Sequence, residues 1–342
     1  MKKLYKIIKS VIFILIIICG VFYLNQIFMR KSLEKPWDMG NKIGGFYNEV
    51  EDFPIMFFGT SHAYCSFEPL VIYENTGNKS YVFSSQQQPL AISARYIKEA
   101  IRENNPKIIF VDIQALLLEL QEDYSVVHSY ADYMPLSVNK LEMILRNVPS
   151  EFKMQALLPF VSYHSRWDEL TEEDYHITFS SYEDYLKGYV LLKNQSENFK
   201  NNVSDTDEKL KKFDYKKYIS ENINFIDEII KIARENNLEL YFVKTPIYYH
   251  DDPNTLEKIN LISNHIREAQ GTFINFNDYY DYLNLSKEDF YDPSHLNVHG
   301  AEKFNKFFSN FLIENNIVSK KVADDKLWLK DLEKYNFEKN KI

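Results

Sequence analysis

The sequence predicts an α/β fold with a mostly parallel sheet, preceded by a single N-terminal membrane-spanning helix. Short, continuously apolar runs typical of strands covered on both faces alternate with helical segments through short joints, which predicts the fold class. An apolar stretch without acidic residues near the N-terminus predicts the helix. The predicted parts are a signal anchor (1–30), a juxtamembrane spacer (31–52), an α/β domain (53–318) with an insertion at about 116–213, and a charged C-terminal tail (319–342).

The predicted spanning helix covers about residues 7–29, with an uninterrupted apolar centre from Val11 to Tyr23. This length approaches the roughly 20 residues that a helix needs to cross a bilayer. Four lysines precede the apolar centre of this helix and two basic residues follow the helix, which favours a cytoplasmic N-terminus and an extracytoplasmic domain. A cleaved signal peptide is the alternative, although no small-x-small site follows Tyr23. We expect a single-pass protein of the cell membrane whose partners include the lipid bilayer.

The α/β domain begins with the apolar strand 55–58, which Gly59 ends. Strands and helices then alternate as in βαβ units, except within the predicted insertion. The further predicted strands are 80–83, 107–113, 238–243 and 272–276, and the predicted helices are 91–104, 218–236, 256–269 and 301–315. Functional side chains of such a sheet gather beyond the carboxyl ends of its strands, so the site is expected there.

The composition excludes two classes of protein. The net charge is −9 and the acidic residues are spread along the chain, so no basic footprint of a nucleic-acid binder exists and no nucleic-acid partner is expected. Only two cysteines occur, Cys19 within the apolar segment and Cys65, so the chain encodes no disulfide framework. The 25 Tyr and 25 Phe provide large side chains for a core and for an aromatic-lined cleft.

Ser61 and the pair Asp292 and His295 are the candidate catalytic residues. Ser61 lies in Gly-Thr-Ser-His directly after the first strand, and the Asp-x-x-His pair precedes the last predicted helix of the domain. Serine is a weak nucleophile unless a base removes its proton, and histidine titrates in the range suited to that task. A carboxylate three residues before His295 can orient the imidazole and stabilise its charged form. The three residues therefore predict a serine acyl-transfer site.

An oxyanion needs hydrogen-bond donors near the serine. We expect backbone amides at the start of the helix that contains Ser61 to supply some of them. The polar loop after the second strand and the end of the third strand, where Asp112 lies, are expected to supply more. The predicted oxyanion or substrate-binding residues are Ser85, Gln86, Gln88, Gln114 and His62.

Simpler roles exist for each motif. Gly-Thr-Ser-His and the Asp-x-x-His loop are also typical of residues that cap helices. His295 and His299 are four residues apart with Asp292 nearby, a spacing that also fits a metal site, but no second pair of ligands accompanies them. Cys65 has no neighbour that would lower its pKa, so burial is the expected fate of its thiol. We expect neither a metal nor any other cofactor.

The combined motifs resemble those of the SGNH (GDSL-like) hydrolase superfamily. Gly59-Thr60-Ser61-His62, residues 84–88, and Asp292-x-x-His295-Leu296-Asn297 with Gly300 before a helix resemble its first, second and last blocks. More narrowly, the chain is similar to membrane-anchored SGNH proteins of bacterial cell envelopes, of the DltD-like and alginate-acetylation types. The similarity covers residues 54–120 and 215–315.

This resemblance implies a three-layer α/β/α sandwich with a flavodoxin-like sheet and a Ser61–His295–Asp292 triad. It also implies an esterase or acyltransferase that acts on O-acyl groups, acetyl or D-alanyl, of an envelope polysaccharide or teichoic acid. The implied partner is a membrane-bound O-acyltransferase. The chain departs from the family pattern at two places. A Ser-Gln-Gln run replaces the usual Gly of the second block, and Asp112 and Gln114 stand where the third block has Asn. A non-catalytic assembly or polymer-binding subunit, with Tyr163 and Trp167 as a carbohydrate platform, is the alternative.

Overall fold

Five parallel strands form the centre of the protein in the computed structural model, which describes residues 2–29, 39–120, 123–172, 174–175, 184–200, 214–248 and 253–341. The spatial order is β2-β1-β3-β4-β5. The strands are β1 (Ile55–Phe58), β2 (Ser80–Val82), β3 (Ile108–Asp112), β4 (Glu239–Lys244) and β5 (Thr272–Asn275). The predicted α/β class with a parallel sheet is confirmed, and all five predicted strands are present.

The order of the strands reverses at β1, because β2 lies on one side of it and β3 to β5 follow on the other. In β1 and β3, Phe57 lies opposite Phe110 and Phe58 opposite Val111. Ligands of open parallel sheets bind at such a reversal, beyond the carboxyl ends of the strands. The end of β1, where Ser61 follows, is therefore the position at which this sheet offers a site.

The main helices occupy the predicted positions with adjusted ends. They are α5 (Leu90–Glu103), α15 (Pro253–Glu268) and α17 (Val298–Glu314). The region predicted as one helix over 218–236 consists of two, α13 (Tyr215–Asn222) and α14 (Asn224–Glu235). Shorter helices lie between the strands and around the site: α3 (Ser61–Ser66), α4 (Pro69–Thr76), α6 (Gln114–Leu117), α16 (Tyr280–Leu283), and the 3₁₀ turns η4 (Phe276–Tyr279) and η5 (Lys287–Asp289).

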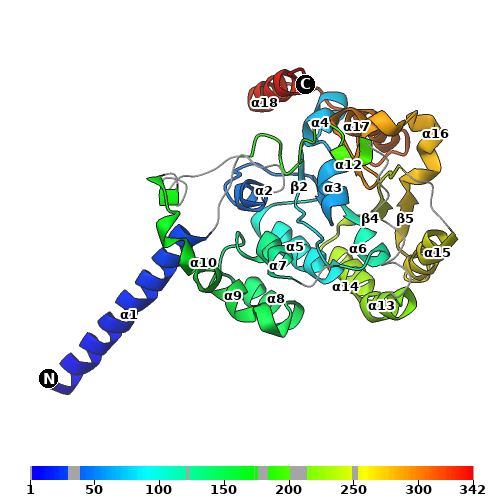
Figure 1. The fold of residues 1–342 in the computed structure, drawn as a ribbon. Helices are drawn as coiled ribbons and strands as arrows, with labels where there is room; N and C mark the ends of the chain where they lie inside the picture. Colours follow the sequence, from blue (N-terminus) through cyan, green and yellow to red (C-terminus); the bar gives the residue numbers. More distant parts are fainter. Residues whose placement is uncertain are drawn as a thin grey trace.

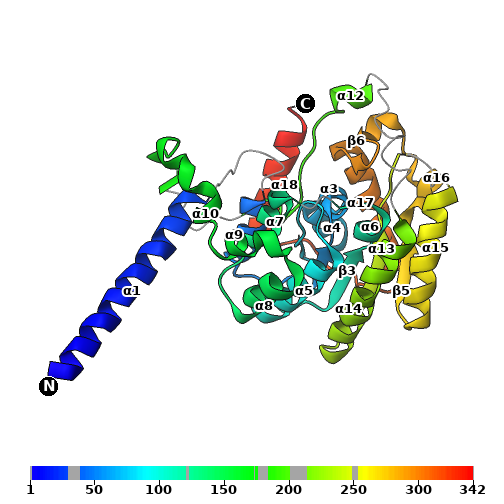
Figure 2. The same cartoon turned by 60° about the horizontal axis from the view of Figure 1, so that its bottom comes forward.

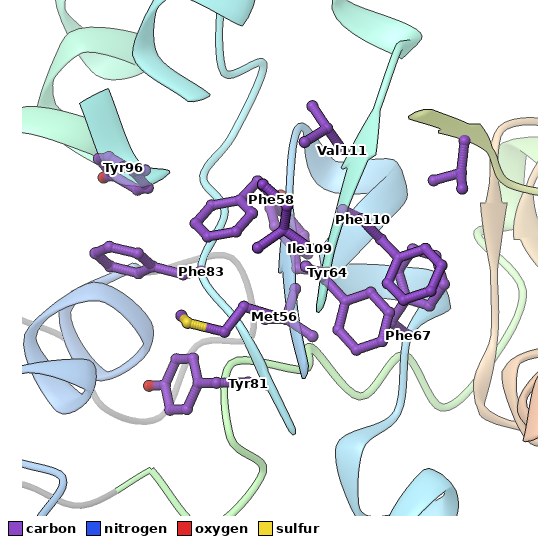
Figure 3. Close-up of a cluster of buried hydrophobic side chains, with 14 of the residues drawn as sticks. Met56, Phe58, Tyr64, Phe67, Tyr81, Phe83, Tyr96, Ile109, Phe110 and Val111 are labelled. Atoms are coloured by element: carbon purple, nitrogen blue, oxygen red, sulfur yellow. The ribbon is translucent and has the colours of Figure 1, made fainter. Parts of the chain in front are cut away.

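Aromatic side chains pack against the central strands. Successive side chains of a strand point to opposite faces, so Phe58 and Phe57 pack with different neighbours. Phe58 lies 6.4 Å, between ring centroids, from Phe83, which stacks on Tyr96 of α5 at 4.3 Å (Figure 3). Phe57 stacks on Phe67 at 4.1 Å. The expected aromatic core is thus built around β1, the strand that leads to Ser61.

Helix α1 (Lys2–Phe28) extends away from the rest of the molecule (Figure 1). It is long and apolar enough to cross a membrane, and no other helix of the described residues is. The same features fit a membrane anchor or a signal sequence. Helix α2 (Gly40–Phe46) lies within the predicted spacer and is largely buried, with Lys42 paired to Asp184 at 2.9 Å.

The predicted insertion contains two different parts. Its first part is helical, and α8 of this part packs against α5. The helices are α7 (Tyr124–Ala131), α8 (Val138–Asn147), α9 (Lys153–Leu157) and α10 (Phe160–Tyr163), with the 3₁₀ turns η1 (Ser150–Phe152) and η2 (His164–Asp168). Its second part, residues 189–196, follows a turn at 185–188, contains no helix or strand and leads to α12 (Glu197–Lys200); it is called the crossing segment below. Residues 176–183 and 201–213 of the predicted insertion lie outside the described residues.

The charged C-terminal region forms a helix, α18 (Lys326–Lys339), that packs against α4. Trp328 is fully buried, and its indole N–H donates to Glu51 at 2.7 Å. The ammonium groups of Lys79 and Lys187 lie 5.8 and 5.6 Å from the Trp328 ring. One tryptophan within a charged sequence thus fixes the helix to the domain.

Candidate active site

Ser61 is the first residue of α3, three residues after the end of β1. Thr60 caps this helix, because its hydroxyl accepts a hydrogen bond from the His62 N–H at 3.2 Å. The Thr60 hydroxyl also donates to the buried Asp112 carboxylate at 2.8 Å. Gly59 has φ +146°, and a Cβ at this position would lie 2.6 Å from the Cβ of Asp112. Glycine is therefore required for the turn that presents Ser61.

Asp292 and His295 face each other across a short hairpin formed by β6 (Phe290–Asp292) and β7 (His295–Leu296). One carboxylate oxygen of Asp292 accepts the backbone N–H groups of Ser294 at 2.8 Å and His295 at 3.0 Å. Asn297 then caps α17 by accepting from the N–H of Gly300 at 3.2 Å. The three-residue spacing thus arises from a two-residue turn that brings both side chains to the same end of the hairpin.

The structure brings the three predicted residues together. Ser61 Oγ lies 2.8 Å from His295 Nε2, and His295 Nδ1 lies 2.9 Å from each carboxylate oxygen of Asp292. Burial by itself would raise the pKa of Asp292, but the hydrogen bond and charge of His295, with the two backbone N–H groups, hold it below its usual range. Asp292 is therefore ionised at neutral pH and can stabilise a charged imidazole.

Two side chains of α3 lie beside this triad. The ring of His62 is 4.9 Å from the ring of His295, and His62 is only 3% exposed. Burial, and then the neighbouring charges of His295 and Lys244, lowers the pKa of His62 well below its usual range, so this ring is neutral. Tyr64 is fully buried, and burial raises the pKa of its hydroxyl well above the usual range. Tyr64 follows Ser61 by three residues, a helical spacing from which its proximity is predictable.

The crossing segment links α3, which carries Ser61, to the hairpin and helix α17 around Asp292 and His295. The N–H of Val190 donates to the Tyr64 carbonyl at 2.8 Å. Two residues later, the Leu192 carbonyl accepts the N–H of Val298, the first residue of α17, also at 2.8 Å. The N–H of Ser196 donates to the Tyr291 carbonyl at 2.7 Å. This segment therefore holds α3 and the Asp292–His295 hairpin in register, a role that its irregular sequence does not indicate.

Asp112 is a buried acidic residue at the end of β3. It accepts the Thr60 hydroxyl and, at 3.2 Å, the backbone N–H of Gln114. Burial raises the pKa of Asp112 to about 6, although these hydrogen bonds and the charge of Lys244 oppose the increase. Asp112 thus fixes the turn before Ser61 from the neighbouring strand.

The predicted oxyanion residues occupy different environments. The Ser85 hydroxyl donates to Gln88 at 2.9 Å, the Gln88 amide donates to Ser93 at 2.9 Å, and Ser85 and Gln88 are fully buried. The Gln86 carbonyl accepts the Ser129 hydroxyl at 3.3 Å. Gln114 is 6% exposed, and its Oε1 has no hydrogen-bond partner among the described residues. The polar groups of Ser85 and Gln88 are thus engaged in holding the loop after β2 to α5.

The remaining candidates do not join the triad. His299 is exposed, and across the described part of the chain no group of three or more His, Cys, Asp or Glu side chains is arranged to hold a metal ion. Cys65 is buried, and burial, followed by the charge of Asp292, raises the pKa of its thiol well above the usual range. Comparison with models of known protein families and with curated proteins gives no match.

Proposed function

We propose that this protein is a serine esterase or acyltransferase that uses Ser61, His295 and Asp292 as a catalytic triad. The observation that carries the proposal is the continuous contact from Ser61 Oγ through both ring nitrogens of His295 to Asp292. A helix cap alone does not require this contact, because Thr60 and Asn297 already cap the two helices. The side chains of His295 and Asp292 are 17% and 28% exposed, which allows a substrate to approach.

In the proposed reaction, Ser61 Oγ attacks the carbonyl carbon of an acyl ester while His295 Nε2 takes the hydroxyl proton. Asp292 accepts the Nδ1 proton in a hydrogen bond and stabilises the imidazolium. His295 then gives its proton to the departing alkoxide, which leaves an acyl group on Ser61. A hydroxyl group or water, whose proton His295 Nε2 takes, then attacks the acyl carbon. The bond from Ser61 Oγ to the acyl group breaks, the acyl group passes to the acceptor, and His295 returns the proton to Ser61.

When Ser61 attacks, negative charge develops on the carbonyl oxygen of the ester. Hydrogen-bond donors near that oxygen are needed to stabilise this charge. Ser61 is the first residue of α3, where a backbone N–H has no acceptor within the helix. We assign this N–H as one donor and the Gln114 side chain, which follows the neighbouring strand β3, as the second. Gln86 and His62 are then substrate-contacting candidates, whereas Ser85 and Gln88 position the loop.

The substrate class follows from α1 and from the resemblance to envelope SGNH proteins. An apolar N-terminal helix with lysines before it supports a domain outside the cell membrane. The proposed substrates are O-acetyl or D-alanyl esters of a cell-envelope polysaccharide or teichoic acid, and a membrane-bound O-acyltransferase is the proposed partner. A strand order of 2-1-3-4-5 and aromatic packing against β1 support the three-layer arrangement of that superfamily.

Labelling with a fluorophosphonate, which reacts with activated serines, tests the proposal. We expect the detergent-solubilised full chain to be labelled and Ser61→Ala to lose all labelling. Ser294→Ala is the matched control, because it removes a nearby hydroxyl and keeps the N–H that donates to Asp292. Absence of labelling and of ester turnover in a correctly folded wild-type chain would contradict the proposal.

A non-catalytic assembly or polymer-binding subunit is the second candidate. It is favoured by the engagement of Ser85 and Gln88 with each other and with α5, which removes two predicted donors from the site. The two residues suggested as a carbohydrate platform have different surroundings. The Tyr163 ring packs on the His128 ring, with 5.4 Å between the ring centroids. Trp167 is 72% exposed in η2, which packs against α1. Restoration of envelope acylation by Ser61→Ala in a strain that lacks the protein would favour this function over catalysis.

A further inference from the structure

Exposed large apolar side chains concentrate on α8, α9, α10 and the adjoining turns. Outside α1, the described residues include 17 such side chains, and eight of them fall within the 32 residues from 136 to 167. Scattered single apolar residues are ordinary on a protein surface, but a contiguous set marks an interaction site. This set, called the apolar patch below, consists of Leu136, Val138, Leu141, Leu145, Met154, Leu157, Val161 and Trp167.

Helix α8 carries apolar side chains on two faces. Met143 and Ile144 are buried in the domain. Val138, Leu141 and Leu145 are spaced by three and four residues, so they share another side of the helix, and Val138 and Leu145 are 76% and 67% exposed. Packing within the domain explains only the first face. The second face is left exposed by the part of the chain that the structure describes, and an apolar helix face is stable in an apolar environment.

The apolar patch adjoins the C-terminal end of α1. The ring of Phe160 lies 5.1 Å from that of Phe28, and the Phe160 N–H donates to the Asn25 side chain at 2.9 Å. The Arg166 guanidinium donates to the Phe28 carbonyl at 2.8 Å. Figures 1 and 2 show α8, α9 and α10 on the side of the body next to α1, with α16 on the opposite side. The patch is thus attached to the helix that is long enough to cross a membrane.

A cavity of about 630 Å³ lies between α1 and the patch. Ile17, Val21 and Phe22 of α1 line it, together with Leu136 and Leu157 of the patch. These three α1 residues belong to the uninterrupted apolar centre of the helix. When α1 crosses a bilayer, this cavity lies at a depth where lipid acyl chains are the surrounding solvent.

We infer that the apolar patch lies in the outer interface of the same lipid bilayer that α1 crosses, with acyl chains filling the cavity. Apolar helix faces insert about 5–10 Å into the boundary between headgroups and acyl chains. Trp167 is a residue type enriched at that boundary. The domain is then held against the membrane by a second contact beside α1. This inference requires a membrane-inserted α1 and is independent of the proposed acyl-transfer chemistry.

Spin labelling of the full chain in lipid nanodiscs tests the inference. We use nanodiscs of phosphatidylcholine and phosphatidylglycerol, with Cys19→Ala as background and Cys65 unreactive because it is buried. A nitroxide is attached at Leu145→Cys and, in a separate variant, at Tyr282→Cys. Tyr282 lies in α16 and is 81% exposed. We expect a several-fold lower collision rate with a water-soluble nickel chelate at position 145 than at 282, and a higher rate with oxygen.

Equal nickel accessibility at positions 145 and 282 would overturn the inference, because these nanodiscs contain no other protein to cover the patch. A second variant, Leu141→Glu with a label at Val138→Cys, tests the same contact. Leu141 is exposed, so its replacement preserves the domain, and we expect the label to become more accessible to nickel. No change in that accessibility would also contradict the inference. Fluorophosphonate labelling of the same samples reports separately on the proposed chemistry.

Discussion

The His295 ring is held from both sides by single residues that are far apart in the sequence. Asp292 contacts Nδ1 at 2.9 Å, and Ser61, 234 residues before His295, contacts Nε2 at 2.8 Å. The neutral ring of His62 lies against it and adds no positive charge. This environment favours the tautomer with a proton on Nδ1, in which the lone pair of Nε2 accepts the hydrogen bond of the Ser61 hydroxyl.

Replacement of Asp292 tests that orientation. We expect Asp292→Asn to reduce the rate of fluorophosphonate labelling by roughly 10³–10⁴-fold, because an amide can hold the imidazole in the wrong tautomer and cannot stabilise its charge. Thermal unfolding should change little, since the partly exposed hairpin remains. Asp281→Asn, at an exposed carboxylate of α16, is the control and should label at the wild-type rate. A wild-type rate in Asp292→Asn would remove Asp292 from the mechanism.

Ser61, Asp292 and His295 could be predicted because the end of a strand and an Asp-x-x-His loop are both recognisable from neighbouring residues in the sequence. The partnership of Thr60 with Asp112 was not predictable from spacing, since their contact depends on how β1 pairs with β3. The engagement of Ser85 with Gln88 was missed for a related reason. A polar loop at a strand end is compatible with substrate binding and with internal hydrogen bonds, and only the three-dimensional structure distinguishes them.

At the scale of elements, the turn from β1 to α3 depends on close contact with β3. Gly59 brings the backbone against Asp112, so the position of Ser61 is determined by two strands. The strands themselves were predictable because each is a short apolar run. Helix α2 was missed, because its Lys42 is buried only through an ion pair with a partner 142 residues away.

Gly59→Ala should therefore destabilise the protein by about 3 kcal/mol or more, through a strained φ and a clash with Asp112. Gly44→Ala is the matched control, since a Cβ there has no neighbour within 4 Å and φ is not positive. We expect the control to change stability by less than about 1 kcal/mol. Urea unfolding in detergent micelles measures both. Similar stabilities for the two variants would contradict the proposed constraint at Gly59.

At the scale of the whole molecule, α18 closes over α4 through a buried carboxyl group. Tyr335 of α18 donates to Glu68 at 3.0 Å, and Glu68 is 2% exposed. Burial raises the pKa of Glu68 to about 8, so this group is mostly protonated at neutral pH. The C-terminal helix is thus attached through an uncharged acid as well as through Trp328.

This burial predicts a pH-dependent stability. A group whose pKa is raised on folding stabilises the folded state fully below its unfolded pKa of 4.5 and loses that contribution as the pH rises through about 8. Between pH 6.5 and 8, the free energy of unfolding should fall by up to about 1.4 kcal/mol per pH unit. The raised pKa of Asp112, about 6, acts mainly below this window.

Glu68→Gln should remove this decline, because an amide does not ionise and still accepts the Tyr335 hydroxyl. Glu74→Gln, at an exposed position of α4, should keep the wild-type slope. Urea unfolding at several pH values between 6.5 and 8 measures the effect. If the free energy of unfolding of Glu68→Gln still falls between pH 6.5 and 8 as in the wild type, another group causes the pH dependence.

The 234-residue separation of Ser61 and His295 has a consequence for synthesis of the chain. Chains are made from the N-terminus, and domains acquire structure as they emerge. Strand β1 and Ser61 are made first, whereas the hairpin with Asp292 and His295 follows more than 200 residues later. A growing chain that has not reached the hairpin therefore carries Ser61 without its contact to His295. The proposed acyl transfer can therefore begin only after the hairpin of β6 and β7 has been made and has folded against α3.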